Sequence, residues 1–78
     1  MNVDRLVAMA NDIASFFASE PESAAAEAVA QHLTRYWERR MKRQIIEHQR
    51  AGGSGLTAIA AAGVALLAAR DEASGARA

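Results

Sequence analysis

The sequence predicts an all-α protein, a small helical bundle of three to four helices in one domain. Apolar side chains recur at intervals of three and four residues along most of the chain, which is the helical period. The only proline and a cluster of glycines stand between these periodic segments, where helices end and begin. The longest apolar run covers residues 56–69, which is shorter than the roughly 20 residues needed to cross a bilayer and typical of a buried helix.

Composition places the chain near the lower size limit for a stable core. It has 78 residues, and about half of its apolar residues are alanine, which buries little area. The absence of cysteine excludes disulfides, iron–sulfur ligation and thiol chemistry, and it suits a cytoplasmic location. The N-terminal residues show no secretory signal. We expect modest stability in isolation, which a partner or self-association as a homo-oligomer would raise.

The first helix is expected at about residues 3–18. Asn2 precedes it and can accept a hydrogen bond from an otherwise unpaired backbone N–H. Met9 and Phe16 widen its apolar stripe on one flank. Asn11 is a poor helix former, expected either in solvent or in a hydrogen bond across a subunit interface. The stripe itself consists of Val3, Leu6, Val7, Ala10, Ile13, Ala14 and Phe17.

Pro21 separates the first helix from a second, expected at about residues 21–37. Proline lacks the N–H donor and therefore suits only the first turn of a helix. Ser19 and Glu22 have the spacing of a capping box, in which each side chain accepts a backbone N–H of the other residue.

The region after residue 37 allows two interpretations. The apolar stripe continues in phase, and no glycine or proline interrupts it before Gly52 and Gly53, which supply a helix end. A third helix at about residues 39–51 is one interpretation. The other is a continuous helix over residues 21–51.

The last helix is expected at about residues 56–70. It is apolar on nearly every side, so it must be buried, either inside the domain or against a second chain. Gly63 leaves a smooth surface on which another helix can approach closely, although glycine lowers helix propensity. The domain therefore covers residues 1–70, and the small, polar residues 71–78 are expected to form a flexible tail.

The net charge of zero conceals an uneven distribution. Residues 1–34 carry −4 and residues 35–50 carry +4. Wound as a helix, the second stretch has a cationic face of Arg35, Arg39, Lys42, Arg43 and Arg50. Its apolar stripe consists of Trp37, Met41, Ile45 and His48. An apolar stripe backed by a cationic one is typical of a contact surface.

No pattern in the sequence indicates catalysis. His32 and His48 are far apart and lack a third ligand at a useful helical offset, so we expect no metal site. Tyr36 and Trp37 stand on an apolar stripe, which favours core or subunit contact over base stacking, and Arg40 can lie against either ring. We expect a chain that is not itself an enzyme and binds no cofactor.

Three blocks of the sequence resemble, in order, the delta subunit of cytoplasmic, molybdenum-dependent, NAD-linked formate dehydrogenases. Residues 6–14, L-V-A-M-A-N-D-I-A, are similar to the family's L-V-x-M-A-N-x-I, and paired phenylalanines follow. Residues 30–42, A-Q-H-L-T-R-Y-W-E-R-R-M-K, resemble H-L-x-R-F-W-D-P-R-M-R, with Glu38 and Arg39 in place of Asp-Pro. Residues 51–56, A-G-G-S-G-L, are similar to A-G-G-x-G-L.

The resemblance implies a non-catalytic accessory subunit that docks on the large molybdenum-bearing catalytic subunit. It would support assembly, cofactor maturation or stability of a complex that oxidises formate and reduces NAD⁺. The molybdenum pterin, iron–sulfur clusters, FMN and NAD would belong to the partner subunits. We expect apolar contact from Tyr36, Trp37, Met41 and the last helix, and electrostatic orientation from Arg35, Arg40 and Arg43. The complete set of expected partner-binding residues is Asn11, His32, Arg35, Tyr36, Trp37, Arg40, Met41, Arg43, Gly52, Gly53 and Leu56.

A second hypothesis is a small helical homo-oligomeric module that binds nucleic acid through the basic face of residues 35–50. Arginine and lysine are the natural partners of phosphate, and such binding would weaken steeply with salt. This hypothesis comes second because a nucleic-acid binder more often carries a net positive charge than the zero found here.

Overall fold

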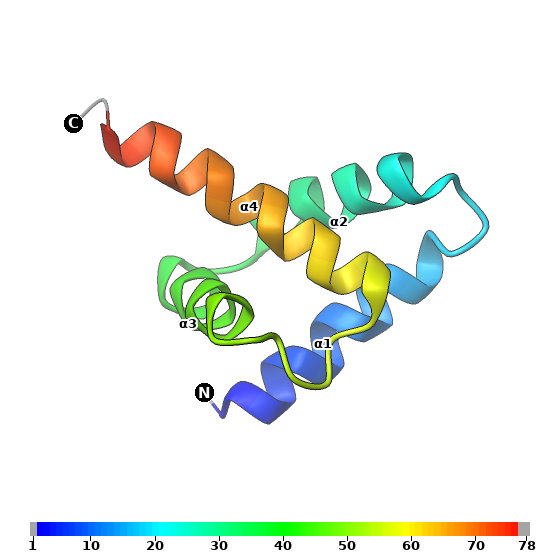
Figure 1. Ribbon diagram of the computed structural model, residues 1–78, viewed down its shortest axis with the longest axis horizontal. Coiled ribbons are helices and arrows are strands. Elements are labelled where there is room, and N and C mark those ends of the chain that lie inside the picture. The colour runs from blue at the N-terminus through cyan, green and yellow to red at the C-terminus, as the bar shows by residue number, and fades with distance from the viewer. Residues whose placement is uncertain (1, 77–78) are drawn as a thin grey trace.

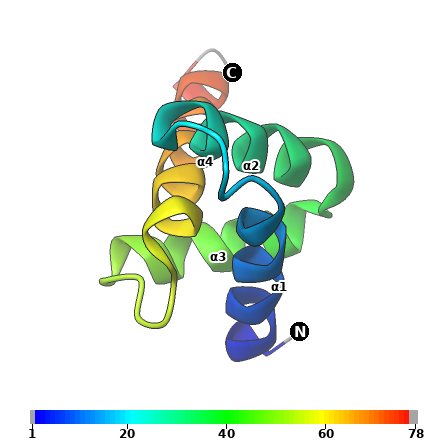
Figure 2. The same cartoon turned by 90° about the vertical axis from the view of Figure 1, so that its right-hand side faces the viewer.

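Four helices follow one another along the chain in the computed structural model, which describes residues 2–76 and, for side chains, residues 2–73. They are α1 (Val3–Phe16), α2 (Glu22–Tyr36), α3 (Arg39–Arg50) and α4 (Ala58–Ala76), and residues 2–76 contain no strand. Figure 1 shows α3 nearly end-on, and Figure 2 shows it passing across the molecule behind α1. The four helices thus form a bundle of crossing rather than parallel helices, and the expected all-α class is confirmed.

The first two helices begin differently. The Asn2 side chain accepts a hydrogen bond from the backbone N–H of Asp4 at 2.7 Å, as expected for an N-cap. At α2, the expected capping box of Ser19 and Glu22 is wrong, because Pro21 itself occupies the N-cap position and no side chain caps the helix. The Pro21 carbonyl accepts the first helical hydrogen bond, from the N–H of Ala25 at 2.9 Å.

The chain breaks between α2 and α3, so a continuous helix over residues 21–51 is excluded. Trp37 and Glu38 have ψ angles of 140° and 156°, which are extended rather than helical values. The indole of Trp37 belongs to the hydrophobic core and is only 6% exposed. No side chain caps the start of α3. The change of direction is accompanied instead by burial of this large aromatic side chain.

The core draws on all four helices. The largest fully buried side chains are Leu6 on α1, Val29 and Leu33 on α2, Ile45 on α3 and Val64 on α4. One side of the apolar last helix is therefore buried inside the domain, mainly against α2, while Ala58, Ala65 and Ala69 on the other side are exposed. Figure 1 shows α4 lying across the other elements.

Gly63 lies at the closest approach of α2 and α4. A Cβ atom at this position would lie 2.5 Å from Cγ1 and 2.6 Å from Cβ of Val29, closer than carbon atoms can pack. It would also lie 3.2 Å from the Ala26 carbonyl oxygen. The expected close approach of another helix at this glycine is therefore confirmed, and that helix is α2.

The last helix extends further than expected. It continues to Ala76, so residues 71–76 are helical where the sequence predicted the helix to end at about residue 70, while residues 77–78 of the expected tail lie outside the described part of the chain. Glu72 makes an ion pair with Arg50 of α3, and Arg70 makes one with Glu27 of α2. These contacts join the second half of α4 to two other helices. Within residues 2–76, no helix is long and apolar enough to cross a membrane.

Candidate partner-binding surface

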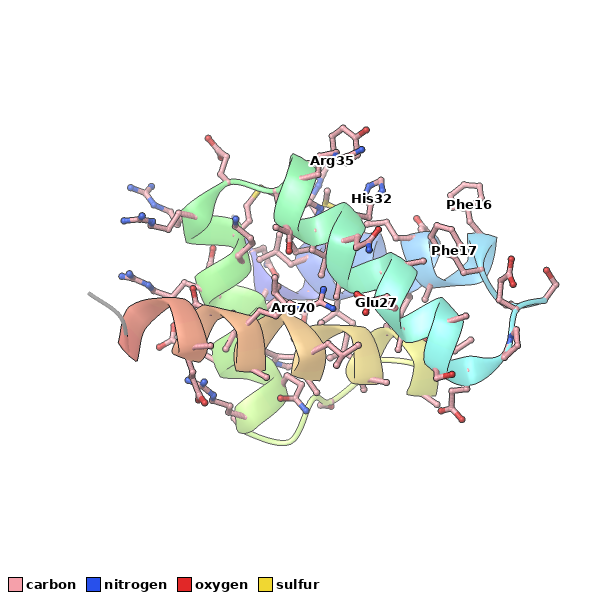
Figure 3. The ribbon with its side chains drawn as sticks, turned by 90° about the horizontal axis from the view of Figure 1, so that it is seen from above. Phe16, Phe17, Glu27, His32, Arg35 and Arg70 are labelled. Carbon is pink, nitrogen blue, oxygen red and sulfur yellow. The ribbon has the colours of Figure 1, made fainter. Side chains whose placement is uncertain are left out.

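Two large aromatic side chains are exposed among the residues that the structure describes. Phe16, at the end of α1, is 80% exposed, and Tyr36, at the end of α2, is 66% exposed. The neighbouring Phe17 is half-buried and packs against the core. Figure 3 shows Phe16 and Phe17 on the same outer side of the molecule as His32 and Arg35 of α2.

A shallow hollow runs along this side of α2. It has a volume of about 230 Å³ and is lined by Phe17, Ala28, Gln31, His32, Arg35 and Tyr36. The rings of His32 and Tyr36, one helical turn apart, lie with centroids at 4.7 Å and planes tilted by 47°. The hollow therefore has aromatic walls on a fixed helical scaffold.

A second hollow lies beside the first. It measures about 340 Å³ and is lined by Gln31, Thr34, Arg35 and Arg70. Gln31 and Arg35 thus border both hollows, and the ion pair between Arg70 and Glu27 positions the far side (Figure 3). We call the surface formed by Phe16, Phe17, Gln31, His32, Arg35 and Tyr36 the aromatic–basic face.

The cations around the α2–α3 junction have no acidic partner in the described part of the chain. The two ion pairs between side chains of residues 2–73 use Arg50 and Arg70. The four exposed arginines of this junction take part in neither: Arg35, Arg39, Arg40 and Arg43. Arg39 and Arg40 line a further shallow hollow with Glu38. The surface is therefore positively charged where α2 ends and α3 begins.

The structure corrects the expected role of Trp37. Its side chain lies in the core of the chain itself, and so it is not available to a partner in this fold. Met41 is half-buried and packs against the same core. The apolar stripe of α3 expected as a contact surface is thus covered by the other helices, with Ile45 fully buried.

Asn11 also has a different role from the two that were expected. Its Nδ2 donates to the Gly55 carbonyl oxygen at 2.9 Å, and its Oδ1 accepts from the Thr57 N–H at 2.9 Å. His48 Nε2 donates to the Ser54 carbonyl oxygen at 2.7 Å. Asn11 and His48 therefore fix the loop between α3 and α4 from two sides.

The glycines of this loop allow backbone angles that other residues rarely adopt. Gly52, Gly53 and Gly55 have φ angles of 124°, 64° and 86°, which L-residues rarely adopt. The Gly53 N–H bonds to the His48 carbonyl oxygen at 2.9 Å, and Leu56 packs against the core. Partner contact through Gly52, Gly53 and Leu56 stays a prediction. The turn itself requires the two glycines, and the core accounts for Leu56.

The residues that the sequence-based set missed are Phe16, Phe17 and Gln31. Phe16 was assigned to the flank of the apolar stripe, yet its side chain lies in solvent. A signal was present, because adjacent helical residues point about 100° apart and two successive phenylalanines cannot share a narrow stripe. Of the expected set, His32, Arg35 and Tyr36 come together here, whereas Arg40 and Arg43 are exposed on α3.

The side chains of this surface suit binding to another protein. Among the described residues, no three His, Cys, Asp or Glu side chains gather where they could hold a metal ion. The side chains around the aromatic hollow offer rings, one amide and one guanidinium, a set that suits a protein side chain.

A comparison with known families gives one match. The family model described as the NADH-dependent formate dehydrogenase delta subunit, FdsD, matches residues 5–64, which include most of α1, all of α2 and α3, the loop between α3 and α4, and the first part of α4. No curated protein and no solved structure matches the chain. The matched span covers well over half of the 78 residues and contains the whole aromatic–basic face and the loop between α3 and α4. The chain therefore belongs to the FdsD family of formate dehydrogenase delta subunits.

Proposed function

We propose that the chain is a non-catalytic accessory subunit that docks on the large, molybdenum-bearing subunit of an NAD-linked formate dehydrogenase. In this role it supports assembly, cofactor maturation or stability of the complex. Family membership implies association with a formate dehydrogenase complex. The molybdenum pterin, iron–sulfur clusters, FMN and NAD belong to the partner subunits in this proposal, and this chain contributes a surface.

The observation that carries the proposal is the exposure of Phe16 and Tyr36. Single exposed apolar residues are common, but exposed apolar side chains that form a contiguous patch mark interaction sites, and aromatic side chains are enriched where proteins bind each other. Both rings are held by helix ends, and Phe17 and His32 extend the apolar area between them. Docking through this surface would remove the rings from water.

The proposal is tested by co-purification from cells. A tagged chain is expected to retain the large subunit, and Phe16→Ala or Tyr36→Ala is expected to weaken capture about tenfold, the effect of losing an interface anchor worth about 1.4 kcal/mol. Both side chains are exposed, so the fold is expected to stay intact, which circular dichroism checks.

The matched control is Ala65→Ser, on the exposed side of α4 about 200° round the helix from Gly63 and the contact with α2. Its capture is expected to equal that of the unmodified chain. A tagged chain that never retains the large subunit contradicts the proposal. Equal capture by both aromatic variants would move the docking surface away from this face.

A further inference from the structure

We infer that the aromatic–basic face binds an acidic segment of the large subunit, one that carries carboxylates beside a large apolar side chain. The inference rests on the proposed function and adds the chemistry of the partner. It follows from two hollows that share a border, one aromatic and one polar, with an unpaired guanidinium between them.

The first hollow selects the apolar part of the segment. Its volume of about 230 Å³ lies below the roughly 300–1,000 Å³ of small-molecule pockets and is of the order of one large side chain. Phe17 and Ala28 form the apolar part of its lining, and the mutually tilted rings of His32 and Tyr36 form another wall. A leucine, isoleucine or phenylalanine of the partner fits these walls.

The guanidinium of Arg35 selects the charge. It borders both hollows, and no described carboxylate lies within ion-pair distance of it. Arg70, on the other side of the second hollow, is already paired with Glu27. An arginine presents a planar fork that binds a carboxylate through two parallel hydrogen bonds. A carboxylate next to the apolar anchor would therefore lie over Arg35.

The neighbouring charges favour the same partner. Arg39 and Arg40 follow within five residues of Arg35, with only Glu38 as a nearby acid on that segment. Two acids, Asp12 and Glu20, each stand four residues from Phe16 in the sequence, at the α1 end of the face. The positive end of the face therefore attracts an acidic segment, and attraction between exposed groups acts mainly on association rate and orientation.

A nucleic acid would use the same arginines through its phosphates. Unstacked bases could also stack on the rings of this hollow. The net charge of zero favours a protein, because a nucleic-acid binder more often carries a net positive charge. The experiment below therefore includes a nucleic acid as a competitor.

The experiment measures binding of the full chain to the purified large subunit at increasing NaCl concentration. Arg35→Glu is expected to weaken binding by about 10- to 100-fold at low salt, and Arg35→Lys by only a few-fold, because lysine keeps the charge but loses the planar fork. The affinity of the unmodified chain is expected to fall as salt screens the contact.

The matched control is Arg5→Glu, an exposed arginine about 16 Å along α1 from Phe16, expected to bind within twofold of the unmodified chain. Binding that does not depend on salt, together with an Arg35→Glu variant whose affinity equals that of the unmodified chain, overturns the inference and leaves the proposed function standing. Displacement of the large subunit by a 20-nucleotide single strand overturns it in favour of nucleic acid. Failure of the unmodified chain to bind the large subunit overturns both.

Discussion

Asn11 shows how one side chain can organise a loop that lies far away in the sequence. Its amide bonds to the backbone on both sides of Leu56, at the Gly55 carbonyl and the Thr57 N–H, and so it holds the residue that precedes α4. A neutral amide suits this position because it donates and accepts at once. Neither of the roles expected from the sequence included a contact within the chain.

Replacing Asn11 by alanine is expected to lower the free energy of unfolding by about 0.5–1.5 kcal/mol, measured by urea denaturation. The loss is moderate because Gly55 and Thr57 are exposed and water can replace the amide. Asn11→Asp keeps the acceptor but places a carboxylate against the Gly55 carbonyl oxygen, so it is expected to be at least as destabilising. The neighbouring exposed Asp12→Ala serves as control and is expected within 0.5 kcal/mol of the unmodified chain. Equal urea midpoints for all variants and the unmodified chain would contradict the role of Asn11 in holding the loop between α3 and α4.

Part of the candidate surface could be predicted from residue types alone. His32, Arg35 and Tyr36 recur at three and four residues on α2, so their shared side follows from the helical period. Trp37 continues the same sequence pattern, yet an extended backbone turns it into the core. That turn depends on how α3 packs against the other helices, a tertiary property that local spacing does not contain.

At the scale of elements, the contact of α2 with α4 depends on Gly63. Gly63→Ala is expected to lower stability by about 1–3 kcal/mol, because the added methyl group overlaps Val29 and the helices must separate. Helix propensity alone predicts the opposite sign, a gain of about 1 kcal/mol. The exposed Ala65→Gly is the control and is expected to lose about 1 kcal/mol through propensity. Thermal unfolding followed by circular dichroism measures both, and a stabilised Gly63→Ala would contradict the close packing.

Two of the three boundaries between helices were predictable, because proline or glycine marks them locally. The boundary between α2 and α3 has neither residue, so the sequence left a continuous helix open there. The end of α4 was not predictable either. Small polar residues after Arg70 indicated a frayed end, whereas the ion pair of Glu72 with Arg50 connects this part of α4 to α3. Sequence patterns record which residues suit a helix, but not which distant side chain will hold its last turns.

The whole molecule combines a covered core with an uncovered face. At roughly 0.05–0.15 kcal/mol per residue, a chain of 78 residues is expected to have a free energy of unfolding of about 4–12 kcal/mol. The core is filled by all four helices, so the chain can fold before it meets a partner. Binding then adds stability by mass action instead of completing the fold.

Hydrogen exchange can measure this coupling. With free large subunit at 100 times the dissociation constant, the slowest backbone amides of the chain are expected to exchange about 100-fold more slowly, equivalent to about 2.7 kcal/mol. Slow exchange of core amides is already expected for the isolated chain. Core amides that exchange at the rate of an unfolded peptide until the large subunit is added would contradict a self-sufficient core.

Tyr36 and Trp37 are neighbours in the sequence, but one ring faces water and the other faces the core. Because the chain has a single tryptophan and a single tyrosine, their optical signals separate two events. Tryptophan emission should shift to the red only when the chain unfolds, and it should be indifferent to docking. Tyrosine absorbance should change when the exposed phenol is covered, so the unmodified protein carries its own pair of spectroscopic reporters.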